Sequence, residues 1–181
     1  MLTKLSPAAV AQVDAALPRH ADFPRAGITF VDVLPLFSSP ALRSLALDAL
    51  ADAVRALPTP ITHVAGFEAR GFLFISLAER LSLPFVCLRK AGKLPGEKER
   101  VDYALEYGTA SIEISVGAIP PAASVLLVDD LLATGGTASA GEELVRRAGA
   151  TPAAVAVLVE IEAIGGAAAL SSPHVITVLR V

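Results

Sequence analysis

The sequence has one cysteine and few charged residues, and both shortages narrow what the protein can be. Of its 181 residues, 18% are charged and 54% are hydrophobic. The single cysteine, Cys87, excludes an internal disulfide and is typical of a reducing compartment, so we expect a cytoplasmic protein. Because Cys87 lies in the apolar run Pro84–Leu88, we expect it to be a buried structural residue. A net charge of −3 gives no general attraction to nucleic acid.

Several kinds of segment and motif are also missing. The most apolar stretch, Ala148–Ile164, is interrupted by a proline and two glutamates, whereas a membrane helix needs roughly 20 largely uncharged residues. The N-terminus lacks the basic and apolar regions of a secretory signal. No serine lies in a nucleophile-elbow pattern. The three histidines are far apart and have no partners at metal-ligand spacing, so we expect structural or surface roles for His20, His63 and His174.

The hydrophobic pattern predicts a single α/β domain over residues 1–181. Apolar spacing and capping residues predict helices over residues 7–17, 40–57, 72–81 and 137–148. Short β-prone runs lie between and after them: Ile61–Gly66, Phe85–Arg89, Ser111–Val116, Val125–Asp129, Ala154–Glu160 and Val175–Val181. This alternation predicts a mostly parallel central sheet flanked by helices. Ala21–Phe37 and Lys90–Gly108 show no clear periodicity, and such long segments are often binding loops or lids.

The most informative stretch is Ser124–Gly141, which reads SVLLVDDLLATGGTASAG. It predicts a buried strand, a glycine-containing loop and then a helix. In open α/β sheets, ligands bind beyond the carboxyl ends of the strands, where this loop is expected to lie. Glycine lets the backbone approach an anion closely, and the start of a helix offers N–H groups to it. We therefore expect a monophosphate to bind at Ala133, Thr134, Gly135, Gly136 and Thr137.

Two carboxylates, Asp129 and Asp130, precede this loop and would repel a phosphate bound alone. Their presence is explained if the ligand also carries neutral hydroxyl groups, as ribose 5-phosphate does. The carboxylates would then accept hydrogen bonds from the 2′ and 3′ hydroxyls and help to anchor hydrated Mg²⁺. The pattern matches neither of the common glycine-rich nucleotide loops. The alternative, a helix N-cap with incidental acids, leaves most of these residue types unexplained.

This stretch resembles the phosphoribosyl-pyrophosphate signature of the type I phosphoribosyltransferases, and its Leu-Ala-Thr-Gly-Gly-Thr is similar to their adenine branch. The resemblance implies a parallel sheet flanked by helices, with a small hood over the base. It also implies that Asp129 and Asp130 bind the ribose hydroxyls and that residues 133–137 bind the 5-phosphate. Mg²⁺ is then expected to be held mainly through the substrate near the two acids, with no direct protein ligand.

A second loop between a strand and a helix, Gly66–Phe72, resembles the family's pyrophosphate loop. Its Arg70 has the geometry to hold pyrophosphate oxygens with two hydrogen bonds. The resemblance implies a cis peptide bond between Glu68 and Ala69, with both residues at the pyrophosphate. The residues alone leave open that Arg70 only pairs with a neighbouring acid.

A basic turn, Arg89–Gly96, reads RKAGKLPG and closely resembles a further motif of the family. Its cations, Arg89, Lys90 and Lys93, would answer the charge of pyrophosphate. Taken without the resemblance, an ordinary solvated basic turn remains the alternative.

The segment Tyr103–Gly108 reads YALEYG and matches a motif of the adenine branch, in which the glutamate lies on a loop that closes over the reacting centre. The resemblance makes Glu106 the candidate catalytic residue and Tyr103 and Tyr107 lid residues. It also implies that residues 90–108 act as a mobile lid loop. Taken alone, Glu106 is equally compatible with a surface acid.

The N-terminal stretch Asp22–Val33 resembles the family's entry to the base pocket, which implies that residues 1–37 contribute a hood and that Thr29, Val31 and Leu131 line the base pocket. Here the sequence departs from the family pattern, because Val31 replaces the usual arginine or lysine and Ala26 replaces a common proline. If that cation packs over the purine, its loss removes a contact of roughly 0.5–2 kcal/mol. If the contact is made by the backbone, little changes.

Taken together, the matches imply a purine-salvage transferase that joins adenine to phosphoribosyl pyrophosphate, giving AMP and pyrophosphate, and that forms a homodimer. Val31 leaves open a xanthine or hypoxanthine/guanine specificity on the same scaffold. A non-catalytic regulator that senses phosphoribosyl pyrophosphate and binds DNA is a further alternative. The sequence shows neither an additional helix-turn-helix segment nor a basic stripe, which disfavours it.

Overall fold

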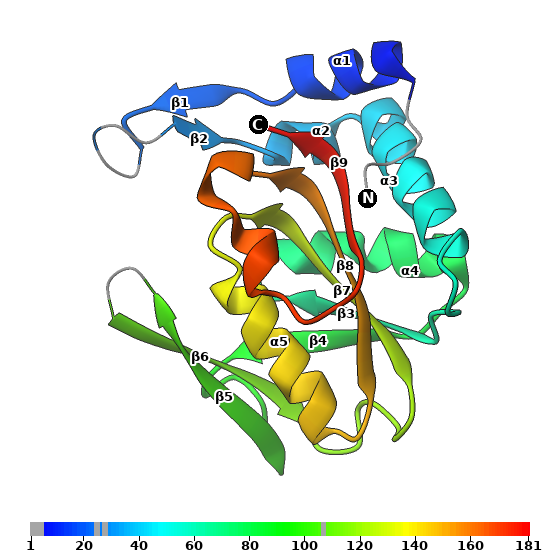
Figure 1. The fold of residues 1–181 in the computed structure, drawn as a ribbon, viewed down its shortest axis with the longest axis vertical. Helices are drawn as coiled ribbons and strands as arrows, with labels where there is room; N and C mark the ends of the chain where they lie inside the picture. The colour runs from blue at the N-terminus through cyan, green and yellow to red at the C-terminus, as the bar shows by residue number, and fades with distance from the viewer. Residues whose placement is uncertain (1–5, 24–25, 27–28, 106–107) are drawn as a thin grey trace.

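The computed structural model describes residues 6–23, 26, 29–105 and 108–181, which form a central sheet covered by helices on both faces (Figure 1). Within these residues the sheet has seven strands in the order β5-β6-β4-β3-β7-β8-β9. The strands are β3 (His63–Phe67), β4 (Phe85–Lys90), β5 (Lys98–Leu105), β6 (Gly108–Ser115), β7 (Ser124–Leu132), β8 (Thr151–Glu160) and β9 (Val175–Arg180). β3, β4, β7, β8 and β9 are parallel, and β5 and β6 add an antiparallel hairpin at one edge. The predicted mostly parallel sheet is confirmed.

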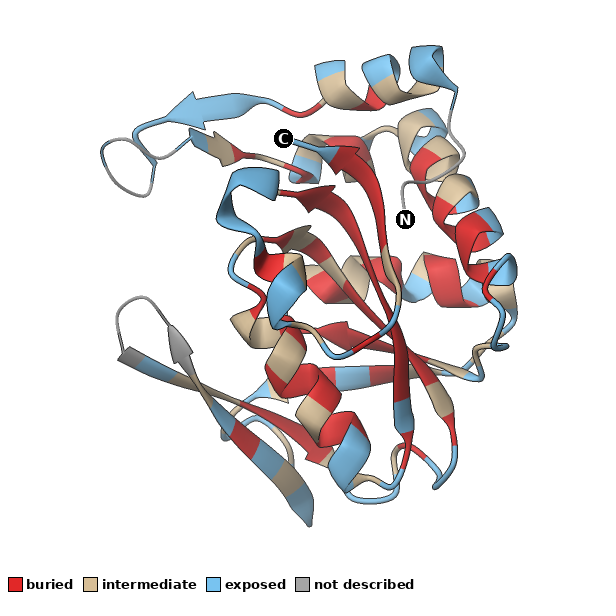
Figure 2. Ribbon diagram, in the orientation of Figure 1, coloured by how far each residue is buried: buried red, intermediate tan, exposed pale blue. Residues whose placement is uncertain are grey.

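The sheet divides the apolar core into two parts, one on each of its faces, and helices cover both parts. Successive residues of a strand point to opposite faces, so Leu126 and Val128 of β7 face one core while Val125 and Leu127 face the other. The helices of the first core are α1 (Pro7–Ala15), α2 (Leu34–Ser38), α3 (Pro40–Arg55) and α4 (Ile75–Leu81), and α5 (Gly136–Arg147) covers the second. Figure 2 shows the central strands buried along most of their length.

Two of the predicted helix starts are made as the sequence suggests. The hydroxyl of Ser6 accepts a hydrogen bond from the N–H of Ala9, and the hydroxyl of Ser39 accepts one from Leu42. In each case the cap satisfies an N–H group that has no partner within the helix. The helix predicted over residues 72–81 differs, because its first part is a 3₁₀ helix, η1 (Arg70–Phe74), and α4 begins only at Ile75.

The two segments without periodicity contain regular structure. β2 (Thr29–Val31) pairs antiparallel with β1 (Arg19–Ala21). This small sheet, which we call the hood, lies beside the carboxyl edge of the central sheet (Figure 1). In the second segment, β5 pairs with β6 along its whole length. The polar composition of β5 predicts a loop, and this prediction is wrong, because an edge strand with an exposed face needs no apolar run.

Cys87 is a second correction, because it is exposed and not buried. Its neighbours Val86 and Leu88 are buried, and the alternation of side chains along β4 turns Cys87 to the opposite face. An apolar run in a sequence predicts burial on both faces, but the face of β4 that carries Cys87 is covered only at Phe85, which packs against the other core.

In the part of the chain that the structure describes, no helix is long and apolar enough to cross a membrane.

Candidate active site

The predicted phosphate loop lies between the end of β7 and the start of α5, where it borders a cavity of about 110 Å³. The N–H groups of the first helical turn have no partners within a helix, so they are available to an anion in this cavity. The structure brings most of the expected residues together around it. Those that line the cavity are Asp129, Leu131, Leu132, Ala133, Thr134, Gly135, Gly136, Thr137, Ala138, Val155 and Val157.

Gly135 shapes this loop, and two features require glycine there. Its φ angle of +81° lies in the left-handed region, which costs little only for glycine. A β carbon at Gly135 would also collide with the carbonyl oxygen of Gly166, in the 3₁₀ helix η3 (Gly166–Ala169). The loop is therefore backed directly by the chain at Gly166, and neither residue has room for a side chain.

Of the two predicted acids, Asp129 lines the cavity, and Asp130, next to it in sequence, pairs with Arg70 instead. The Asp130 side chain is 4% exposed, and its N–H donates to Oδ1 of Asp129 at 2.9 Å. Burial and the neighbouring Asp130 charge raise the pKa of Asp129 well above its usual range. Burial also raises the pKa of Asp130, and the nearby Arg70 only partly offsets this. Two negative charges on this buried acid pair would be poorly solvated. Hydroxyl donors or a nearby cation would stabilise them.

Arg70 lies where three parts of the site meet. Its Nε is 2.9 Å from Oδ2 of Asp130, and its guanidinium carbon lies 5.9 Å from the centre of the Phe30 ring in the hood. The peptide bond between Glu68 and Ala69, just before it, is cis, as predicted. Arg70 thus pairs with an acid, the alternative that the residues left open, while 40% of its side chain remains exposed.

Glu68 holds the basic turn against the loop that carries Arg70. Its carboxylate lies 2.6 Å from Nζ of Lys93 and 2.9 Å from Nε of Arg89, and it accepts a hydrogen bond from the N–H of Lys90. Lys93 and then Arg89 lower the pKa of Glu68 to about 2, against the effect of burial. Two of the three predicted cations are therefore fixed in one cluster, and the exposed Lys90 contributes its backbone to it.

The acid dependence of stability tests this cluster. The folded-state pKa of Glu68 is lowered from 4.5 to about 2, so its contribution is complete above pH 4.5 and is lost as pH falls toward 2. We expect Glu68→Gln to unfold more easily than the wild type at pH 7, and the difference to shrink between pH 4.5 and 2.5. Urea unfolding of both proteins across this range measures it. A difference that stays constant down to pH 2.5 would contradict the role of the carboxylate charge.

The residues expected around the base are less close together. Leu131 lines the phosphate cavity, Thr29 is exposed, and the Val31 side chain is 5% exposed within the core. A larger hollow of about 740 Å³ lies between the hood and the pyrophosphate loop. It is lined by His20, Ala21, Asp22, Phe23, Phe30, Asp32, Leu34 and Arg70. All of these except Arg70 lie within residues 1–37, the predicted hood, and Arg70 was predicted at the pyrophosphate. From the sequence, the hood residues were identified only as a segment, through the Asp22–Val33 motif, and His20 was expected to be structural or on the surface.

The lid residues are described in part. Glu106 and Tyr107 lie outside the described residues. Tyr103 lies on β5, and its phenol oxygen is 3.5 Å from the hydroxyl of Thr137, which donates to it. The hairpin of β5 and β6 therefore meets the phosphate loop at this point.

Two buried acids near the site were not identified from the sequence. Glu113 of β6 is 2% exposed and accepts a hydrogen bond from the N–H of Gly92 in the basic turn. Glu142 of α5 is 1% exposed. In sequence both resemble surface acids, because only the packing of distant segments buries them. Among the residues described, no group of three or more histidine, cysteine or acidic side chains is placed to hold a metal ion.

Comparison with known proteins agrees with this geometry. Residues 36–172 match the model of the phosphoribosyl transferase domain. The adenine phosphoribosyltransferase of Thermobifida fusca is 50% identical over 141 residues, which cover 77% of this chain and 79% of that protein.

Two solved structures of adenine phosphoribosyltransferases share the fold. The Saccharomyces cerevisiae enzyme, in complex with adenine and an imino-altritol bisphosphate, has a TM-score of 0.87 and 38% identity, covering 93% of this chain and 98% of that one. The Trypanosoma brucei enzyme, in complex with AMP, pyrophosphate and ribose 5-phosphate, has a TM-score of 0.86 and 29% identity, covering 98% and 81%. This chain belongs to the type I phosphoribosyltransferases and, within them, to the adenine phosphoribosyltransferase family.

Proposed function

We propose that this protein transfers the phosphoribosyl group of phosphoribosyl pyrophosphate to adenine, giving AMP and pyrophosphate in purine salvage. The observation that carries the proposal is the acid pair Asp129–Asp130 beside the glycine loop, since a sugar diol next to a phosphate explains both. The relatives support it, because the Trypanosoma brucei enzyme was crystallised with AMP, pyrophosphate and ribose 5-phosphate.

In this proposal the sugar phosphate occupies the cavity at the end of β7. The loop Ala133–Thr137 binds the 5-phosphate through the N–H groups at the start of α5 and the threonine hydroxyls. Asp129 and Asp130 accept hydrogen bonds from the ribose 2′ and 3′ hydroxyls, which orients the anomeric carbon toward the hood. Fixed orientation of this kind lowers the barrier by removing the entropy cost of bringing the reactants together.

Pyrophosphate leaves as positive charge develops on the ribose ring, so the leaving group must be neutralised. We propose that Arg70, Arg89, Lys90 and Lys93 do this, and that Glu68 and Ala69 lie at the pyrophosphate beside them. Glu68 is itself an anion, and its part is to hold Arg89 and Lys93 at fixed positions. The contacts of 2.9 and 2.6 Å that its carboxylate makes with these two cations support that assignment.

Mg²⁺ fits this site when it is held mainly through the substrate. Carboxylate oxygens suit this ion, which usually keeps several waters and binds through one or two carboxylates and substrate phosphates. The raised pKa values of Asp129 and Asp130 mark a pair that a nearby cation would stabilise. When bound, the ion would neutralise pyrophosphate oxygens, while the two acids would bind its water ligands.

The base is proposed to lie between the hood and Leu131. Because the Val31 side chain is buried in the core, the family's side-chain cation is replaced here by a residue that offers only its backbone to the base. We propose that Thr29 and Val31 contact adenine through the main chain. Residues 90–108 would close over the centre with Tyr103 and Tyr107, excluding water that would hydrolyse the activated sugar.

An assay of pyrophosphate release with each purine tests the function. We expect adenine to react in the presence of Mg²⁺, and xanthine, hypoxanthine and guanine to react at least about 100-fold more slowly, because a site built to pair the 6-amino group leaves buried groups unpaired with the others. Turnover of hypoxanthine or xanthine without adenine would overturn the specificity. The same assay on the Glu106→Ala variant tests the proposed catalytic residue. If this variant kept near-normal turnover, Glu106 would not be catalytic.

We also propose that the protein is a homodimer and that residues 1–37 form its base-binding hood, as the family resemblance implies. Sedimentation equilibrium of the purified chain measures its oligomeric state.

A further inference from the structure

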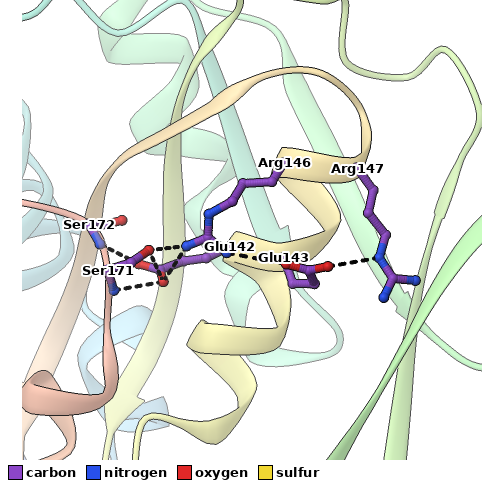
Figure 3. A network of polar contacts seen from close by, with 6 residues as sticks. All are labelled: Glu142, Glu143, Arg146, Arg147, Ser171 and Ser172. Atoms are coloured by element: carbon purple, nitrogen blue, oxygen red, sulfur yellow. Dashed lines mark hydrogen bonds and ion pairs between the residues drawn. The ribbon is translucent and has the colours of Figure 1, made fainter.

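Glu142 is a buried acid in the middle of α5, and its carboxylate clamps a distant segment of the chain (Figure 3). Oε1 accepts a hydrogen bond from the N–H of Ser172 at 2.7 Å. Oε2 accepts from the N–H of Ser171 at 2.9 Å and from its hydroxyl at 2.7 Å. Arg146, one turn further along α5, lies 3.3 Å from Oε2. The carboxylate thus binds two successive backbone amides 29 and 30 residues away in sequence.

The charge of Glu142 is stabilised despite its burial. Burial raises the pKa of this carboxyl, but the hydrogen bonds from Ser172 and Ser171 outweigh that effect, and its pKa is below the usual value. A buried carboxylate that accepts several hydrogen bonds is costly to replace, because its donors are then left without an acceptor. The helix does not need this arrangement, since Glu143, the next residue, forms ordinary exposed ion pairs with Arg146 and Arg147.

The segment that Glu142 binds also packs against the phosphate loop. Ser171 and Ser172 follow η3, which begins at Gly166. A β carbon at Gly166 would collide with the carbonyl oxygen of Ala133 and would lie 2.8 Å from the N of Gly135. One end of this segment therefore packs directly against the phosphate loop. The other end is held by Glu142, which lies on α5, the helix that follows the loop.

We propose that Glu142 is a positioning residue for the 5-phosphate site. By fixing Ser171 and Ser172, it holds η3 against Ala133–Gly135 and keeps the loop amides in the arrangement that binds phosphate. The segment and the loop move together because Gly135 and Gly166 are in contact, so loosening the far end lets the loop relax away from its binding shape. The inference rests on the proposed function only in that residues 133–137 bind the 5-phosphate.

Glu142→Gln tests the inference with little change of volume. Its amide nitrogen would face an N–H donor of Ser171 or Ser172, so at least one hydrogen bond is lost. We expect the dissociation constant for AMP and the KM for phosphoribosyl pyrophosphate to rise on the order of tenfold, the size of effect that a small displacement of a binding group produces. The KM for adenine, kcat and the dissociation constant for inorganic pyrophosphate are expected to stay within about twofold, since those subsites do not touch η3.

Two further variants keep the result interpretable. Glu143→Gln, on the same helix turn but with an exposed side chain, is expected to bind AMP as the wild type does. Ser171→Ala leaves the Glu142 carboxylate and both backbone donors in place, so it is expected to fold even if Glu142→Gln does not, and to weaken AMP binding about two- to threefold.

The outcomes separate the two proposals. A wild type that fails to bind AMP would remove the proposed function. If the wild type binds AMP normally, and Glu142→Gln or Ser171→Ala lowers the melting temperature while leaving AMP affinity unchanged, Glu142 has only a structural role and the inference is wrong. An equal loss of AMP and pyrophosphate binding would also contradict it, because the effect would then not be specific to the phosphate loop.

Discussion

Replacing Asp129 by asparagine is expected to lower kcat/KM about 100-fold while making the folded protein more stable at pH 7. The loss follows from the proposed hydrogen bonds to the ribose diol, since a hydrogen bond to a charged group contributes about 1.5–3 kcal/mol and each 1.4 kcal/mol is a factor of ten. The gain follows from the raised pKa of Asp129, which shows that folding disfavours its ionised form.

The raised pKa of Asp129 also determines how the stability difference between the variant and the wild type changes with pH. Because the folded-state pKa lies above the unfolded value, the native state holds its proton more tightly, and ionisation costs stability as pH rises through that folded pKa. Asparagine carries no such cost, so its advantage in melting temperature is expected to be largest at pH 7–8 and to disappear in acid.

Asp48→Asn is the matched control for this experiment. Asp48 is an exposed acid on α3, and its pKa is lowered by a hydrogen bond from Arg80. Its replacement is expected to reduce stability slightly and to leave turnover unchanged. A melting temperature for Asp129→Asn that falls by as much as in the control would contradict the argument that the acid pair is destabilising, whatever happens to activity.

Gly135→Ala is expected to weaken AMP binding about 100-fold. Alanine in the left-handed region costs roughly 1–2 kcal/mol. Its methyl group would also collide with the backbone of Gly166, which, unlike a flexible side chain, cannot move aside. The loop must shift to relieve this contact, and its N–H groups then no longer converge on the phosphate.

Gly165→Ala separates the two causes. Gly165 also has a positive φ angle, +71°, but a β carbon there would meet no atom within 4 Å. Both substitutions therefore carry the same kind of backbone strain, and only Gly135→Ala carries the collision. We expect Gly165→Ala to lower the melting temperature with nearly normal AMP affinity, measured by calorimetry. Equal AMP affinity for the two variants would show that contact with Gly166 does not shape the loop.

Local sequence signals predicted the parts of the fold that depend on near neighbours. Ser39 and Pro40 begin a helix because a hydroxyl cap and a fixed φ act within one turn. The phosphate loop was identified for a similar reason, since strand, acids and glycines follow one another in a single stretch. Resemblance to the family supplied the cis peptide at Glu68–Ala69, which the residue types alone do not specify.

What was missed depends on contacts between distant segments. The strand β5 is polar because one of its faces is open, and its existence rests on pairing with β6. Cys87 is exposed because of which face of β4 is covered, a fact that no property of the residue itself carries. Glu142 is buried because residues 171 and 172 pack against α5, and two serines in the sequence do not predict such a contact.

From the contact between Arg70 and Asp130 we expect ligand binding to be coupled to proton uptake from the solution. Burial raises the pKa of Asp130, and the charge of Arg70 partly offsets that rise. An anionic ligand that draws the guanidinium toward itself weakens that influence, and the carboxyl group then has a greater tendency to take a hydrogen ion from the buffer. Calorimetric titrations in buffers of different ionisation enthalpy would register this exchange as heat that depends on the buffer chosen.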